Sequence, residues 1–278
     1  MPNYYAHLKF GGKVLALLPA GLAEVLAAER TAFDLGCLGP DPLFFYHILH
    51  PSAVRREGLE LHSRSALEVC ARLRASVEEG VPMAGGYGAG FLCHLALDSA
   101  CHAYVYRKLE DGVVTHMAME GEFDRMLMER DGLKPLGRSY LPRVDDPAVW
   151  TAAAAVYEHV SPHKMEMAYR AMVRYTGMLA RCHGRRRAVA VEAVSHLPGC
   201  GSIRGITLKQ APHPAAEESN AELLRRLEGA VPESARQIGG FFAAVEQGIP
   251  IPKWFDRDFK GNLPERPEPC LGEAVHQH

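Results

Sequence analysis

Helical periodicity is the feature that most restricts the fold of this chain. Apolar residues recur at helical spacing through long stretches, and no segment shows the apolar–polar alternation that is typical of a half-buried strand. Helices are predicted at residues 13–34, 62–79, 85–108, 115–130, 147–159, 163–182 and 221–247. Glycine and proline lie between these segments, as expected for loops between antiparallel helices. The sequence therefore predicts an all-α fold, a multi-helix bundle.

Composition and charge exclude several classes of partner and location. The formal net charge is −2, with 31 basic and 33 acidic residues, so we expect no general attraction to nucleic acid or to an anionic membrane. No apolar stretch approaches the roughly 20 residues of a membrane span, and the start lacks a signal-peptide pattern. The seven cysteines are scattered, unlike those of a disulfide-stapled secreted domain. We expect a cytoplasmic protein with no stable nucleic-acid partner and no transmembrane segment.

Three potential metal ligands share one face of the predicted helix 85–108. His94, Asp98 and His102 follow one another at four-residue intervals, and each such step turns only about 40° around a helix. Their side chains can therefore converge on one point or on neighbouring points. Imidazole nitrogen and carboxylate oxygen are usual zinc ligands, although a lone histidine on a helix face is more often structural. This face predicts a metal site.

The next predicted helix repeats the pattern. His116, Glu120 and Asp124 also follow at four-residue intervals, and two such helices can face each other across a bundle. A carboxylate shared by two ions offsets the repulsion between the cations, and Asp98 is the candidate for that bridge. Glu122 and Asp124 are candidates for orienting a ligand histidine from outside the metal shell. Together the two helices predict a metal cluster.

Further candidates lie upstream, where spacing alone does not decide. Asp41 stands between two prolines that nearly fix its backbone, and a purely structural turn is the alternative interpretation. His47, His50 and His62 follow, and any of them could contribute a ligand. His7 lies close to the amino terminus, so both could meet one ion, but in isolation it would be interpreted as a surface residue.

The order of these residues resembles the zinc-dependent phospholipase C family, whose ligand arrangement single-strand nucleases share. The resemblance covers approximately residues 1–130, and its specificity lies in the whole order rather than in one motif. The matching positions are His7, Asp41 in Gly-Pro-Asp-Pro, His62 after Leu61, His94, Asp98 and His102 in Gly-Phe-Leu-Cys-His-Leu-Ala-Leu-Asp-Ser-Ala-Cys-His, and His116 and Glu120 in His-x-x-x-Glu.

The resemblance implies an all-helical fold with clustered Zn²⁺ ions. It assigns one ion to Asp41, His62, His94 and Asp98, a second to His102, His116 and Glu120, and a third to His7 with the bridging Asp98. In the family the mature amino terminus completes the third site, whereas this chain starts with Met1 and shows no export signal. We therefore expect two or three zinc ions. His62 is favoured over His50 because residues 58–62 resemble the family's approach to that ligand.

The function implied by the resemblance is a zinc-dependent phosphoric ester hydrolase that uses a metal-activated water. A small phosphoester or a phospholipid would be the substrate, and Asp41 is the candidate catalytic base. Two alternatives stay open. The same site could serve a nuclease or nucleotide phosphohydrolase, with Tyr46 or Phe45 stacking on a base. The protein could also be a non-catalytic helical protein that zinc stabilises.

One compact domain is the preferred organisation. Residues 1–142 are interpreted as the phospholipase C-like metal-binding region and residues 143–248 as helices that pack on the same domain. Residues 249–278 are interpreted as a proline-rich tail, in which Trp254 and Phe255 offer aromatic anchors before a loose end.

Overall fold

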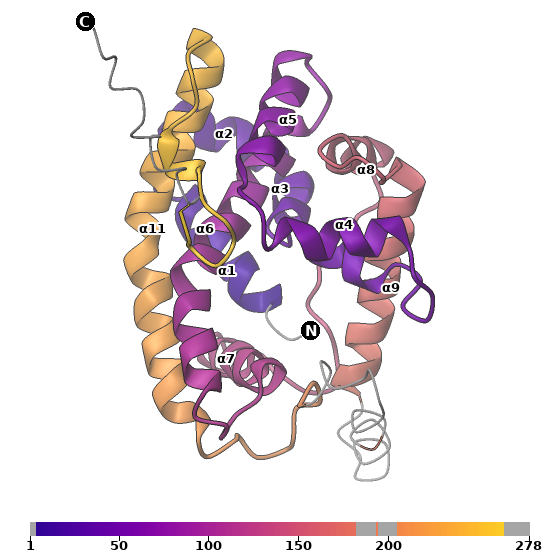
Figure 1. Cartoon of the computed structure of the whole chain (residues 1–278), viewed down its shortest axis with the longest axis vertical. Coiled ribbons are helices and arrows are strands. Elements are labelled where there is room, and N and C mark those ends of the chain that lie inside the picture. Colours follow the sequence, from indigo (N-terminus) through magenta and orange to yellow (C-terminus); the bar gives the residue numbers. More distant parts are fainter. Residues whose placement is uncertain (1–3, 182–192, 194–204, 264–278) are drawn as a thin grey trace, which may run out of the picture.

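The computed structural model describes residues 4–181, 193 and 205–263 and confirms the all-α prediction (Figure 1). Within these ranges the chain forms ten α-helices and two short 3₁₀ helices, without a strand. The elements are α1 (Tyr4–Leu15), α2 (Ala20–Ala28), α3 (Arg30–Gly36), η1 (Asp41–Phe45), α4 (Ala53–Leu61), α5 (Leu67–Glu78), α6 (Ala84–Leu109), α7 (His116–Arg130), α8 (Pro147–Ala154), α9 (Pro162–Ala180), α11 (Ala216–Gln247) and η3 (Lys253–Phe255).

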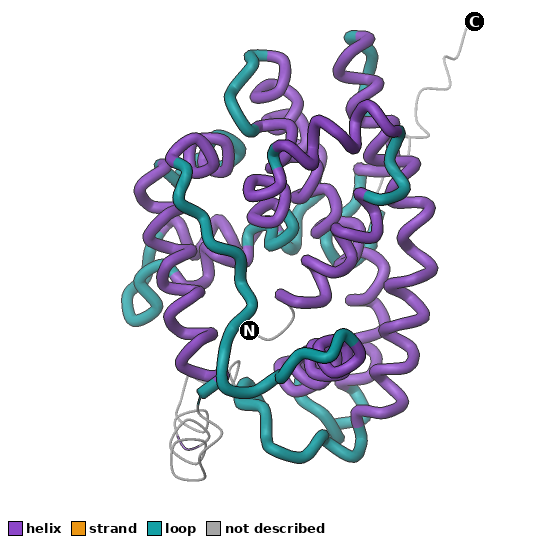
Figure 2. Tube along the Cα trace, turned by 180° about the vertical axis from the view of Figure 1, so that it is seen from behind, coloured by secondary structure: helices purple, strands orange, loops and turns teal. Residues whose placement is uncertain are grey.

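Helix α6 is the centre of the fold. Every residue from Gly86 to Asp98 is buried, as expected for a helix that is surrounded by others. It contacts α1, α2, α3, α5, α7, α8 and α11. Figures 1 and 2 show α11 along one side of the molecule and α9 along the opposite side, with α6 between them. The potential ligands on α6 therefore project from the best-supported element of the chain.

The two ligand-bearing helices are confirmed nearly at their predicted ends. The segment 85–108 corresponds to α6 and the segment 115–130 to α7. Thr115 caps α7 by accepting a hydrogen bond from the Ala118 backbone N–H, 3.3 Å away. Ser and Thr are favoured at this position because their oxygen satisfies a backbone donor that has no partner in the first turn.

One predicted helix is wrong as a single element, and another begins too early. The segment 13–34 is divided between the end of α1, α2 and α3, and Pro19 directly precedes α2 because proline suits a helix start but not a helix interior. The segment 62–79 begins too early, because α4 ends at Leu61 and α5 begins only at Leu67. His62 follows α4 immediately, where the helix ends. This break decides where its imidazole points.

The segment after α11 returns to the bundle and is not a loose tail up to residue 263. Phe255 packs against Phe241 of α11, as expected for an aromatic anchor, and both are fully buried. Phe259 is fully buried against His62 and His94. The rest of the predicted tail, residues 264–278, lies outside the described residues.

Contacts between distant segments join the predicted regions. Helix α9 contacts η1, and α11 contacts α6 and α7. The proposed boundaries at residues 142 and 248 themselves stay predictions. In the described part of the chain, no helix combines the length and apolar character needed to cross a membrane. The four cysteines in that part, Cys37, Cys70, Cys93 and Cys101, carry free thiols.

Candidate metal centre

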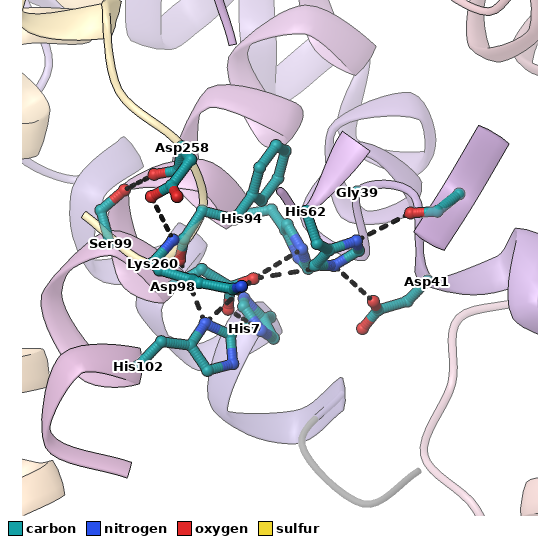
Figure 3. Close-up of polar contacts among 12 residues, drawn as sticks. His7, Gly39, Asp41, His62, His94, Asp98, Ser99, His102, Asp258 and Lys260 are labelled. Carbon is teal, nitrogen blue, oxygen red and sulfur yellow. Dashed lines mark hydrogen bonds and ion pairs between the residues drawn. The ribbon is translucent and has the colours of Figure 1, made fainter. Parts of the chain in front are cut away.

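The predicted ligands gather around one cavity of about 340 Å³. Seven of the eight line it, namely His7, Asp41, His62, Asp98, His102, His116 and Glu120. The eighth, His94, is buried next to Asp98. Figure 3 shows how side chains from α1, η1, the end of α4 and α6 point toward one another. The structure thus brings together residues that are up to 113 positions apart in sequence (His7 to Glu120).

Asp98 lies where four imidazoles converge. Its Oδ1 is 3.3 Å from His7 Nε2, and its Oδ2 is 3.3 Å from His94 Nε2. The same Oδ2 is 3.6 Å from His102 Nδ1 and 3.9 Å from His62 Nε2. Both carboxylate oxygens therefore face histidine nitrogens, which is the geometry that a bridging carboxylate requires.

Two overlapping sets of ligand atoms surround Asp98. His62, His94 and Asp98 each offer an atom within 4.8 Å of the others, and so do His7, Asp41 and His94. Asp41 also approaches His62, with 3.4 Å between its Oδ1 and the His62 Nε2. These two sets, with their shared His94, form what we call the Asp98 group: His7, Asp41, His62, His94 and Asp98.

A second set of ligand atoms lies at the α6–α7 contact. His116 Nε2 is 2.8 Å from Glu120 Oε1, and His102 Nε2 is 3.6 Å from the same oxygen. These atoms also lie within 4.8 Å of one another. We call His102, His116 and Glu120 the Glu120 group. Its members are those that the resemblance assigns to a second ion.

Backbone carbonyls fix the orientation of three histidines. His62 Nδ1 is hydrogen-bonded to the Gly58 carbonyl at 2.8 Å, His94 Nδ1 to that of Cys37 at 3.2 Å, and His102 Nδ1 to that of Phe259 at 3.1 Å. A carbonyl only accepts, so each Nδ1 carries the proton, and a neutral imidazole then has an unprotonated Nε2. This is the usual support of a histidine that binds a metal through Nε2.

The buried polar atoms fit a cation better than they fit one another. His94 Nε2 and His7 Nδ1 are buried and have no hydrogen-bond partner among the residues that the structure describes. In the neutral tautomer set by Cys37, His94 Nε2 is a lone pair that faces the acceptor oxygen of Asp98. Leaving a buried polar atom unpaired costs about 1–3 kcal/mol, and a zinc ion accepts lone pairs from both nitrogen and oxygen.

The electrostatics of the cluster favour positive charge. Burial by itself would raise the pKa of Asp98, but the charge of His102 helps to hold it well below its ordinary value. Burial likewise opposes ionisation of Glu120, yet His116 and His102 lower its pKa. Burial would lower the pKa of His102, but Asp98 and Glu120 raise it to about 10. Both carboxylates are therefore ionised at neutral pH, and a protonated histidine or a bound cation can balance them.

The turn before η1 places Asp41 beside the cluster. Gly39 has φ +53°, and a Cβ there would lie 2.4 Å from His94 Cδ2, so the turn tolerates only glycine without strain. Its carbonyl accepts a hydrogen bond from the Tyr157 hydroxyl at 3.2 Å. The backbone therefore passes directly over the His94 ring before Asp41 begins η1.

The start of α1 is held by α7, and this positions His7. Asp124 accepts hydrogen bonds from the backbone N–H groups of Tyr5 and Ala6, at 3.0 and 2.9 Å. These two bonds show Asp124 supporting the start of the helix that carries His7, whereas its predicted role in orienting an imidazole stays a prediction. Glu122 forms an ion pair with Arg125 at 3.0 Å, and its predicted role in orienting a ligand histidine stays a prediction.

Comparison of the chain with protein-family models, curated proteins and solved structures finds no match. The functional argument consequently rests on the residues and their geometry.

Several residues named at the outset lie elsewhere. His50 is exposed and outside both groups, whereas His62 lines the cavity. Phe45 stacks on Tyr175 and Tyr46 contacts His47, and neither lines the cavity. The aromatic residues that do line it are Phe44, Tyr106 and Phe259.

Sequence reasoning missed the contribution of the segment after α11. Phe259 supplies the carbonyl that orients His102, and Lys260 lines the cavity. The run of aromatic residues that starts at Trp254 and ends at Phe259 is the signal that this segment packs on the core. Nothing in the sequence marks a backbone carbonyl as a partner of a particular histidine.

Proposed function

We propose that this protein is a zinc-dependent hydrolase of phosphoric esters, similar in its ligand order to the zinc-dependent phospholipase C family. The observation that carries the proposal is the convergence of four imidazoles on Asp98, with the Glu120 group beside it along the same cavity. Two neighbouring ligand sets that share a carboxylate-rich cavity are typical of multinuclear phosphoesterases.

Zinc ions bound by the two groups would supply a nucleophile at neutral pH and would polarise the phosphoryl oxygens. Asp41 lines the cavity and is only slightly exposed. We propose that it orients the attacking water and accepts its proton, because a general base must lie within hydrogen-bond reach of that proton. Asp41 Oδ1 lies 3.4 Å from His62 Nε2, so this carboxylate stands next to a proposed zinc ligand.

The cavity wall suits an ester that has an apolar portion. Phe44, Leu59 and Met117 line one cavity with the ligand groups, and Leu59 is 56% exposed. An apolar rim next to a charged centre can hold the organic part of a small phosphoester or a lipid while the phosphate reaches the ligands. The open cavity also favours a catalytic site over a structural zinc site, since structural sites are closed by protein ligands.

A nucleotide phosphohydrolase is the second candidate. Tyr106 lines the cavity, is 43% exposed and lies next to His102 and His116, with ring centroids 5.7 Å apart in each pair. An exposed aromatic face beside a phosphate site can stack on a nucleobase. This role would fall to Tyr106 rather than to Tyr46 or Phe45.

The proposal is tested by metal content and by a substrate panel. Protein purified without chelator should contain two or three zinc ions per chain by elemental mass spectrometry, and the His94→Ala/Asp98→Ala double variant should lose them. His163→Ala is the matched control, because that imidazole is exposed on α9 away from the cavity. The panel comprises 4-nitrophenyl phosphate, bis(4-nitrophenyl) phosphate, a nucleoside monophosphate, single-stranded DNA and phosphatidylcholine micelles. Wild-type protein that binds no zinc even when supplied with it, or that cleaves no phosphoester, would contradict the proposal.

A further inference from the structure

A short loop after η3 is built as a tight turn around Asp258. Its Oδ1 accepts hydrogen bonds from the backbone N–H groups of Lys260 and Asn262, at 2.9 and 2.8 Å. Its Oδ2 accepts a third from the Asn262 side-chain amide at 2.8 Å. A carboxylate that bonds the backbone two residues ahead fixes such a turn.

This turn is attached to α6 at the ligand face. Ser99 Oγ donates to the Asp258 carbonyl at 3.2 Å, and Figure 3 shows the two residues side by side. Gly261 has φ +83°, and a Cβ there would lie 2.5 Å from the Ser99 carbonyl oxygen, so the close approach requires glycine. With Phe259 buried below it, the backbone of Lys260 is fixed relative to His102.

The fixed backbone places the Lys260 side chain at the cavity. Of the described residues that line the cavity, Lys260 is the only lysine or arginine. Its Nζ lies 5.5 Å from the centroid of the Tyr106 ring, and Figure 3 shows the side chain extending toward the Asp98–His102 end of the cluster. Within the described residues, its ammonium group forms no ion pair with a carboxylate. The ammonium group therefore faces the cavity and can still bind an anion there.

The charges of the cavity specify the kind of counter-ion. Asp41, Asp98 and Glu120 bring negative charge, but two divalent ions would exceed it, and Lys260 adds a further positive charge. A phosphate monoester carries between one and two negative charges at neutral pH, whereas a diester carries only one. A quaternary ammonium head group bound in the same cavity would be repelled by the like charge of Lys260.

We propose that Lys260 binds a non-bridging oxygen of the substrate phosphate and makes the site selective for phosphate monoesters over diesters. The inference rests on the proposed phosphoesterase function and names its substrate class. An ammonium group that is held in a cavity binds phosphate through charge-assisted hydrogen bonds. Lys260 acts on binding and specificity and leaves the zinc ligands unchanged.

The experiment compares wild type with Lys260→Met, Lys260→Arg and Lys253→Met, all loaded with zinc. Lys253 is an exposed lysine of the same segment and does not line the cavity. For 4-nitrophenyl phosphate we expect Lys260→Met to lower kcat/KM about tenfold or more, mainly through KM, which is the effect of one charge-assisted hydrogen bond. For bis(4-nitrophenyl) phosphate the loss should stay within about threefold. Lys260→Arg should recover most of the monoester activity, and Lys253→Met should match wild type.

A titration with inorganic phosphate gives a readout that does not depend on turnover. By calorimetry, Lys260→Met should bind phosphate about tenfold more weakly than wild type, with unchanged zinc content. Equal phosphate affinity in the two proteins would overturn the inference, as would an equal loss on both esters. Wild type that cleaves the diester better than the monoester would also overturn it while leaving the hydrolase proposal standing. Wild type that cleaves neither ester would count against the hydrolase, and the phosphate titration would still decide the role of Lys260.

Discussion

The two ligand groups differ in how the chain builds them. In the Glu120 group, His116 and Glu120 are one helical turn apart on α7, and their side chains are 28% and 9% exposed. In the Asp98 group, the side chains of His94 and Asp98 are 1% and 4% exposed, and the other members come from α1, η1 and the end of α4. Two of the three members of the Glu120 group are neighbours on one helix, whereas the Asp98 group forms only when segments far apart in sequence fold together. Zinc should therefore be held differently at the two positions.

The largest effect is expected for Asp98→Asn, which removes the charge at the centre of the Asp98 group that His102 of the Glu120 group also faces. Four histidines face this carboxylate, and an amide is a poor bridge between cations. We expect loss of zinc from both groups and a fall in phosphoester hydrolysis of at least about a thousandfold, or roughly 4 kcal/mol of transition-state stabilisation. Zinc per chain and initial rates measure both effects. Asp111→Asn, in the loop after α6, is the control that should leave them intact.

Glu120→Gln should separate the two groups. Glu120 contacts His102 and His116 but is not one of the ligand atoms gathered around His94. We expect the variant to lose the ion of the Glu120 group, to keep zinc at the Asp98 group, and to hydrolyse substrate about a hundredfold more slowly. We expect the more exposed Glu120 group to release zinc to a chromogenic chelator faster than the buried Asp98 group. The variant should therefore lose the fast phase of release and retain the slow phase. Simultaneous loss of all zinc would show that the groups form one cooperative unit.

Gly39→Ala should damage the Asp98 group through the backbone. The added methyl would meet the His94 ring, and the residue would keep a positive φ. The expected cost in the free energy of unfolding is about 2–4 kcal/mol, measured by urea denaturation of the metal-free protein. Gly12→Ala in α1 is the matched control, because it meets no atom within 4 Å and should be neutral or slightly stabilising. A similar loss in both variants would count against the contact with His94.

The smallest effect is expected for Asp124→Ala. Removing this carboxylate takes the acceptor away from two backbone N–H groups at the start of α1, at a cost of about 1–3 kcal/mol. The position of His7 should loosen, so zinc affinity at the Asp98 group should fall without loss of the Glu120 ion. Asp124→Asn keeps one acceptor oxygen and should cost less. If zinc binding is unchanged in Asp124→Ala, His7 is not held by this contact.

The comparison also shows which parts of the site a sequence can reveal. Ligands on a helix follow from its period, so His94, Asp98 and His102 could be placed on one face before any fold was known. The Glu120 pair follows in the same way. Asp41 and His62 were candidates from the sequence, but only the resemblance assigned them to an ion, because their approach depends on where α4 ends and on the turn at Gly39. Helix ends are the least certain feature of a sequence pattern.

The backbone carbonyls that hydrogen-bond to the histidines could not be predicted from the sequence. The carbonyls of Cys37, Gly58 and Phe259 orient three imidazoles, and every residue possesses such a carbonyl. Only packing decides which of them meets a histidine. The same reason hid Lys260, whose role depends on the turn that Asp258 closes against α6. The fold class followed from local periodicity, whereas the finished site depends on contacts between segments far apart in sequence.

The loop that carries Phe259 has a consequence for the order of events during synthesis. The ligands on α6 and α7 leave the ribosome first, and Phe259 follows roughly 140 residues later, a delay on the order of 10–30 s at ordinary rates of translation. Until then His102 lacks the carbonyl that selects its tautomer, and the cavity lacks its lysine. A nascent chain can therefore form its helices while the pocket is still incomplete. The segment that carries Phe259 therefore completes the pocket only after the ligand-bearing helices have been made.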